Sequence, residues 1–206
     1  DQDVSASQFL STINFSKTNT RLDRWIILEA TKLLAGKLEN DPDTRLFINL
    51  TSQALQDTTL ITWLGVALKA GGIPPDAIIF QFDEANIVDY LKPAIIFAET
   101  IKSMGCKLSI ASFGKSDDPL KTLKNVKADF AKLDGALTKE LENDTATQTL
   151  KSMVSDILAQ NSQAIISDVE NAAALAMLWQ IGVDYIQGSY LAPPAKDMQY
   201  EFTDIA

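Results

Sequence analysis

Polar groups follow the short apolar segments of this chain, and these groups are the ones that could carry chemistry. Carboxylates that converge within a few ångströms can hold divalent cations, and a carboxylate can also accept two N–H bonds from a guanine edge. In a parallel barrel, groups of this kind lie at the carboxyl ends of the strands. The positions in question are Asn49, Gln81 with Glu84, Ala111 with Ser112, Lys132 with Asp134, Ser167 with Asp168 and Glu170, and Gln187.

Strand and helix patterns alternate along the chain and must position these groups. Helical patterns cover residues 22–34, 60–68, 88–104, 150–158 and 175–179, and Pro93 lies in the first turn of the third or kinks it. Near-continuous apolar strands between helices predict a parallel α/β sheet covered by helices. The predicted strands are residues 46–50, 77–82, 107–111, 129–133, 164–166 and 185–186.

The six predicted strands are fewer than a closed barrel needs, which is about eight. Residues 1–7 are polar, and no strand pattern precedes the first helix. We therefore expect one domain over residues 1–206, a TIM-like (β/α) barrel whose N-terminal part is missing.

Composition excludes several classes of function. The chain has 206 residues and a net charge of −9, which argues against broad binding of polymeric nucleic acid but not of a small nucleotide. The single cysteine, Cys106, allows no internal disulfide, fits a reducing cytoplasm and is predicted to be a buried apolar residue. No apolar run is long enough to cross a membrane, and no signal peptide opens the chain. The absence of histidine removes the commonest metal ligand.

The segment 187–194, Gln-Gly-Ser-Tyr-Leu-Ala-Pro-Pro, resembles the last barrel segment of EAL domains, the phosphodiesterase domains that act on cyclic di-GMP. The resemblance extends over residues 9–194 and implies a barrel with two catalytic metal ions. On that pattern Asn49, Lys132 and Gln187 match residues of the family's site. Four positions where the family carries carboxylates are neutral here: Gln81, Ala111, Ser112 and Ser167.

Loss of these four anionic groups removes most of the attraction for two divalent cations. Glu84, Asp134 and Glu170 remain. We therefore expect a degenerate phosphodiesterase site that is not an enzyme and uses no metal.

Within the EAL family, residues 178–188 and the ending 198–202 resemble the FimX group. That resemblance implies a cytoplasmic regulator of type IV pili at the cell pole, with upstream signalling domains. Its EAL domain would bind cyclic di-GMP without metal, and some members dock a PilZ protein. Asp23 matches the group's acceptor of a guanine edge, whereas Ser167 and Asp168 replace its Glu-Phe pair.

Simpler explanations exist for the candidate ligand residues, which are Asp23, Asn49, Lys132, Ser167, Asp168, Glu170 and Gln187. Asp23 and Asn49 could cap helices, Lys132 could pair with a nearby acid, and Glu84 and Glu170 could complement helix dipoles. Trp25, Trp63 and Trp179 are predicted to lie in the core. A scaffold that has lost the nucleotide is the alternative to a receptor, favoured by Ser167 and Asp168.

Overall fold

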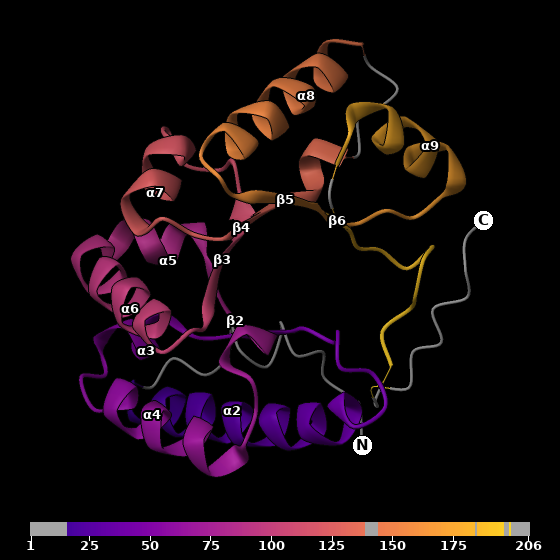
Figure 1. Cartoon of the computed structure of the whole chain (residues 1–206). Helices are drawn as coiled ribbons and strands as arrows, with labels where there is room; N and C mark the ends of the chain where they lie inside the picture. The colour runs from indigo at the N-terminus through magenta and orange to yellow at the C-terminus, as the bar shows by residue number, and fades with distance from the viewer. Residues whose placement is uncertain (1–15, 139–143, 184, 196–197, 199–206) are drawn as a thin grey trace, which may run out of the picture.

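A computed structural model describes residues 16–138, 144–183, 185–195 and 198 of the chain. Its six strands form one parallel sheet in sequence order, each strand hydrogen-bonded to the next. The sheet curls into part of a barrel, and the helices cover its outer side (Figure 1). The strands are β1 Leu46–Asn49, β2 Ile78–Asp83, β3 Lys107–Phe113, β4 Phe130–Leu133, β5 Gln163–Ile166 and β6 Tyr185–Ile186.

The helices lie between the strands in a repeating strand–helix order, as the sequence predicted. They are α2 Ser16–Leu38, α3 Ser52–Gln56, α4 Leu60–Gly71, α5 Glu84–Asp89, α6 Leu91–Ser103, α7 Pro119–Val126, α8 Asp144–Ala159 and α9 Ala172–Ile181, with short 3-10 turns at Pro75–Ala77 and Gly135–Thr138. No helix in these described ranges is both long enough and apolar enough to cross a membrane.

The predicted α/β architecture and all six predicted strands are confirmed. The single helix expected over residues 88–104 is instead two helices, α5 and α6, separated at Tyr90. Pro93 lies in the first turn of α6, where its missing N–H removes no helical hydrogen bond. Cys106 is buried, as predicted, and burial raises the pKa of its thiol to about 11.

Two of the three tryptophans do not lie in the core. Trp25 on α2 and Trp179 on α9 are each 60 % exposed, so the prediction for them is wrong. The apolar stripes on these helices bury Ile27, Leu34, Leu175 and Leu178 instead. A large ring can lie at the border between the buried and the exposed face of a helix. Sequence periodicity does not distinguish a border position from a buried one.

Side chains inside the curled sheet form two layers. The lower layer is apolar and contains Phe47, Ile79, Phe130 and Ile165. The Phe47 and Phe130 rings meet edge to face at 5.3 Å. Because side chains alternate across a strand, the residues two positions further on face the same interior. That upper layer is polar and comprises Asn49, Gln81, Ser109, Lys132, Ser167 and Gln187.

Candidate functional site

The upper layer brings four of the predicted ligand residues together from separate strands: Asn49, Lys132, Ser167 and Gln187. Asn49 and Gln81 are register partners on β1 and β2, and Gln81 in turn is the register partner of Ser109 on β3. The backbone hydrogen bonds between β5 and β6 continue one residue beyond β6, where the Gln187 N–H donates to the Ile166 carbonyl at 2.8 Å. The predicted clustering at the strand ends is therefore present in the fold.

An amide occupies the position on β2 where the resemblance places a carboxylate. The Gln81 side chain is 4 % exposed, and its Nε2 donates to Asn49 Oδ1 at 2.5 Å. Its Oε1 accepts from the Ser109 hydroxyl at 3.0 Å. Both ends of this amide are thus engaged by neighbouring strands, and its N–H group faces the Asn49 oxygen that could otherwise accept a cation.

Lys132 places an ammonium in the polar layer. Its side chain is half-buried, and burial lowers its pKa while the charge of Asp168 acts in the opposite direction. None of the described residues hydrogen-bonds to this ammonium. A lysine in these surroundings can donate to an anionic ligand such as a phosphate.

The segment after β5 holds the other acidic and polar candidates. Ser167 is buried, and its hydroxyl donates to the Leu133 carbonyl at 2.9 Å. Asp168 has a left-handed backbone (φ 60°) and an exposed side chain that lies over Gly135. Glu170 is also exposed. These two carboxylates are open to a ligand, whereas Ser167 is committed to the neighbouring strand.

Gln187 is exposed at the end of β6, and the chain beside it is tightly packed. A Cβ added to Gly188 would lie 2.0 Å from the Val169 carbonyl oxygen. The absence of a side chain at Gly188 therefore lets the backbone of Val169 approach closely. This contact fixes the place of Gln187 relative to the loop that carries Asp168 and Glu170.

Asp23 is not part of the polar layer at the strand ends but lies on α2. Its side chain is fully buried, its Oδ1 accepts from the Thr51 N–H at 3.0 Å, and its Oδ2 accepts from the Thr51 hydroxyl at 2.8 Å. Burial raises the pKa of this carboxyl to about 6, although both hydrogen bonds from Thr51 oppose the shift. Asp23 thus ties α2 to the residues that follow β1. The predicted guanine contact stays a prediction, and it would require this carboxylate to be uncovered first.

The two positions after the middle of β3 carry no carboxylate. Ala111 is the register partner of Asp83, and the pairing with β4 is irregular between Ile110 and Phe113. Ser112 has a positive φ of 52°, a strained conformation for a residue other than glycine. The backbone turns sharply here and leads into Gly114 and the loop that follows.

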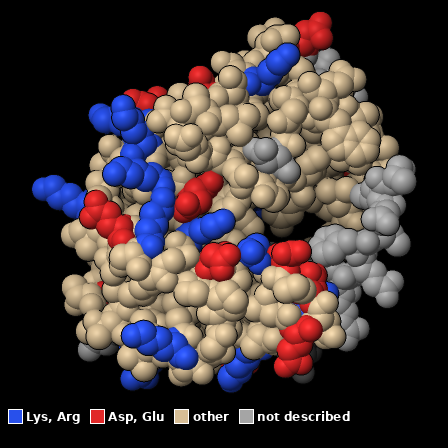
Figure 2. All heavy atoms as spheres, viewed as in Figure 1, with Lys and Arg blue, Asp and Glu red and all other residues tan. Residues whose placement is uncertain are grey.

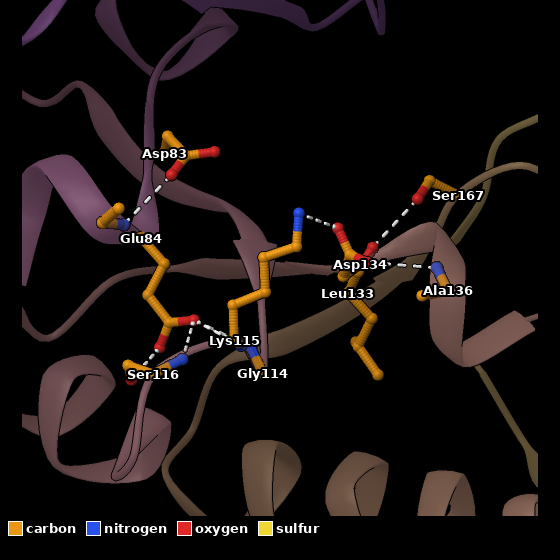
Figure 3. Close-up of polar contacts among 10 residues, drawn as sticks. Asp83, Glu84, Gly114, Lys115, Ser116, Leu133, Asp134, Ala136 and Ser167 are labelled. Atoms are coloured by element: carbon orange, nitrogen blue, oxygen red, sulfur yellow. Dashed lines mark hydrogen bonds and ion pairs between the residues drawn. The ribbon is translucent and has the colours of Figure 1, made fainter.

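Glu84 fixes that loop, a role that the sequence did not reveal. Although it opens α5, its carboxylate is 1 % exposed and accepts the N–H groups of residues 114, 115 and 116 at 2.8–3.2 Å (Figure 3). It also accepts the Ser116 hydroxyl at 2.6 Å. The loop partners lie 30–32 residues further along the chain, so no local pattern could have indicated them.

Lys115 was also missed by the sequence analysis. Its side chain reaches from the Glu84-bound loop to the residue that follows β4, where its Nζ lies 2.7 Å from Asp134 Oδ2 (Figure 3). The hydrogen bond to Asp134 raises the pKa of Lys115. Figure 2 shows basic and acidic side chains adjoining in the middle of the same face. In the sequence, the only feature that could have drawn attention to Lys115 is its position directly after Phe113 and Gly114, shortly after the predicted strand of residues 107–111.

The donors at the strand ends do not fit the two metal ions that the resemblance implies. Gln81 directs an N–H group, which cannot bind a metal, at the Asn49 oxygen, and the Ala111 side chain has no atom that binds a metal. The Asp134 carboxylate is already paired with the Lys115 ammonium. Within the part of the chain that the structure describes, no group of three or more His, Cys, Asp and Glu side chains could hold a metal ion.

Comparison with known proteins assigns the family. The model of the EAL domain matches residues 1–194. The chain belongs to the EAL family. The solved FimX EAL domain of Pseudomonas aeruginosa bound to cyclic di-GMP is 38 % identical, with a TM-score of 0.91 over 98 % of this chain and 81 % of that one. The resemblance to EAL domains, and the part of the fold that this chain supplies, are therefore confirmed.

More distant relatives carry enzymatic names. The cyclic di-GMP phosphodiesterases PdeF and PdeR of Escherichia coli are 23 % and 24 % identical over 94 % of this chain. The chain spans about a quarter of the length of these relatives, 26 % and 29 % respectively.

These names contradict the prediction that the chain is not an enzyme. The prediction relied on counting carboxylates at Gln81, Ala111, Ser112 and Ser167. A ring of strand ends is larger than the six described strands, so the count covered only part of a possible ligand set. The neutral residues are a fact of the described site, but they do not determine the activity of an EAL domain.

Proposed function

We propose that this domain binds cyclic di-GMP at the carboxyl ends of its parallel strands, without a metal ion, and reports the bound state to protein partners. The observation that carries the proposal is the polar layer with the half-buried Lys132 ammonium. Support comes from the FimX EAL domain, which is described as bound to cyclic di-GMP and shares 38 % of its residues with this chain.

The residues of the layer suit the chemistry of a cyclic dinucleotide. Lys132 can donate to a phosphate, while the Gln187 amide can both donate to and accept from a base or ribose. Asp168 and Glu170 are exposed carboxylates that can accept the N–H groups of a guanine edge. Asn49 offers its amide from the opposite side of the layer, and Asp23 supports the end of β1.

The proposed output is contact with other proteins. We propose a cytoplasmic regulator of type IV pili that acts together with upstream signalling domains and a PilZ-type protein. The role in pili and the PilZ-type partner rest on the resemblance to the FimX group. The upstream domains are also supported by the relative PdeF, because this chain matches only 26 % of its length.

A protein-interaction scaffold without the nucleotide is the second candidate, and one observation favours it. Ser167, which replaces an acidic residue of the FimX group, turns its hydroxyl to the Leu133 carbonyl. Ser167 can therefore make fewer contacts with a bound nucleotide than the acidic residue that the FimX group carries at this position.

Calorimetric titration of the full-length protein with cyclic di-GMP separates the two candidates and locates the site. We expect Lys132→Met and Gln187→Ala each to weaken binding by roughly tenfold, the usual effect of losing a charge-assisted or buried polar contact. Lys151→Met, at an exposed position on α8, is the matched control. Absence of binding by the unmodified protein would favour the scaffold, and unchanged affinity in both site variants would place the nucleotide elsewhere.

A further inference from the structure

The Lys115 ammonium lies beside the acidic residue that follows β4. Asp134 directly follows the last residue of β4, Leu133, and its carboxylate is the partner of this ammonium. It receives the Lys115 ammonium at 2.7 Å and the Ala136 N–H at 3.1 Å. Lys115 is 60 % exposed, and the described residues give its ammonium no other ion pair.

The loop geometry holds this ammonium in place. The Glu84 carboxylate accepts three consecutive N–H groups of the loop, including that of Lys115 itself. Gly114, which has a φ of 102°, supplies a turn that other residues adopt only with strain. The Lys115 side chain therefore leaves a fixed backbone and extends over the end of β4 (Figure 3).

The charges around Lys115 explain what its ammonium does. The carboxylates of Asp134, Asp83 and Glu84 all act on it. Without a cation, these acidic groups would repel the phosphates of a dinucleotide at close range. A metal ion would normally supply that cation, but the donors at the strand ends do not fit one, and the Lys115 ammonium is bound to Asp134.

We propose that the Lys115 ammonium replaces a metal ion at this site: it neutralises Asp134 and donates its remaining N–H groups to a phosphate of the bound dinucleotide. The inference rests on the proposed binding of cyclic di-GMP. An ammonium has three donors, of which the ion pair with Asp134 uses one. Lys115 is thus a ligand-binding residue that is supplied by the loop rather than by the strand ends.

The test compares Lys115→Met and Lys115→Arg with Lys121→Met, an exposed lysine on α7. Affinity for cyclic di-GMP is measured by calorimetry on the full-length protein, with chelator and with added magnesium. In chelator, Lys115→Met should bind roughly tenfold more weakly. Lys115→Arg should stay within about threefold of the unmodified protein because it keeps the charge. Added magnesium should restore part of the affinity of Lys115→Met, because a divalent ion can then approach Asp134.

Two results would overturn the inference. The first is an unchanged affinity in Lys115→Met. The second is a loss that magnesium does not restore, which would leave Lys115 as an ordinary phosphate contact. If the unmodified protein binds no dinucleotide, the proposed function fails, and manganese binding followed by electron paramagnetic resonance decides this inference separately. Lys115→Met should then bind manganese more tightly than the unmodified protein, and equal affinities would refute the replacement.

Discussion

Asp23 shows how one buried carboxyl group can make stability depend on pH. Burial raises its pKa from 3.8 to about 6, so the folded chain binds more protons than the unfolded chain between these values. The free energy of unfolding therefore loses a contribution as pH rises from about 4 to about 6. Two pKa units correspond to about 2–3 kcal/mol.

We predict that Asp23→Asn removes this pH dependence. The amide oxygen can still accept the Thr51 N–H, and the side chain no longer ionises. Urea unfolding at pH 4 and pH 7 should show that the variant gains about 2–3 kcal/mol relative to the unmodified protein across this interval. Asp43→Asn, at an exposed position, is the control. A constant difference at both pH values would contradict the raised pKa.

Glu84 is the second residue whose role can be tested by a single substitution. Glu84→Gln keeps the size of the side chain, and its amide oxygen can still accept the three loop N–H groups, which all bind one carboxylate oxygen, but it removes the negative charge that strengthens these hydrogen bonds. We expect a loss of about 1–2 kcal/mol in unfolding free energy, because hydrogen bonds to a charged acceptor are replaced by weaker bonds to a neutral one.

Hydrogen exchange should also become faster at residues 114–116 of the Glu84→Gln variant. Glu99→Gln, at an exposed position on α6, should change neither the stability nor the exchange. Unchanged protection of the loop in Glu84→Gln would show that other contacts hold it.

At the scale of elements, two glycines that each lie two residues after a strand, Gly135 after β4 and Gly188 after β6, should respond differently to substitution by alanine. A Cβ at Gly188 would lie 2.0 Å from a backbone oxygen of Val169, whereas one at Gly135 would lie 1.7 Å from the Asp168 carboxylate. Backbone cannot yield without shifting β5 and β6, but a carboxylate can rotate away.

We therefore predict that Gly188→Ala costs more than about 3 kcal/mol and Gly135→Ala only about 1 kcal/mol. Thermal unfolding of the two variants measures the difference. Equal losses would mean that the packing around Asp168 is as rigid as that around Val169.

The strands and their end residues could be predicted because each strand is a short apolar run followed by a polar group. Asn49, Lys132 and Gln187 were placed in this way, and the period of two along a strand then aligns them. The contacts of Glu84 and Lys115 could not be predicted, because each depends on loop geometry and on a partner far along the chain. The split between α5 and α6 at Tyr90 was missed because the apolar pattern continues across it.

At the scale of the whole molecule, a receptor that acts by contact must couple its ligand to its partner. If a PilZ-type protein binds, the factor by which cyclic di-GMP tightens that complex must equal the factor by which the partner tightens nucleotide binding. Calorimetry of each binding step with and without the third component measures both factors. We expect them to agree and to exceed one, and a partner that binds equally well with and without the nucleotide would contradict the coupling.

The most direct test of the central claim is the affinity of the full-length protein for cyclic di-GMP in chelator compared with added magnesium. We predict measurable binding in chelator and the same dissociation constant in magnesium, because Lys132 and Lys115 supply the positive charge. The recovered nucleotide is checked by chromatography, so that each constant refers to the intact ligand. Binding that appears only with magnesium would contradict the account.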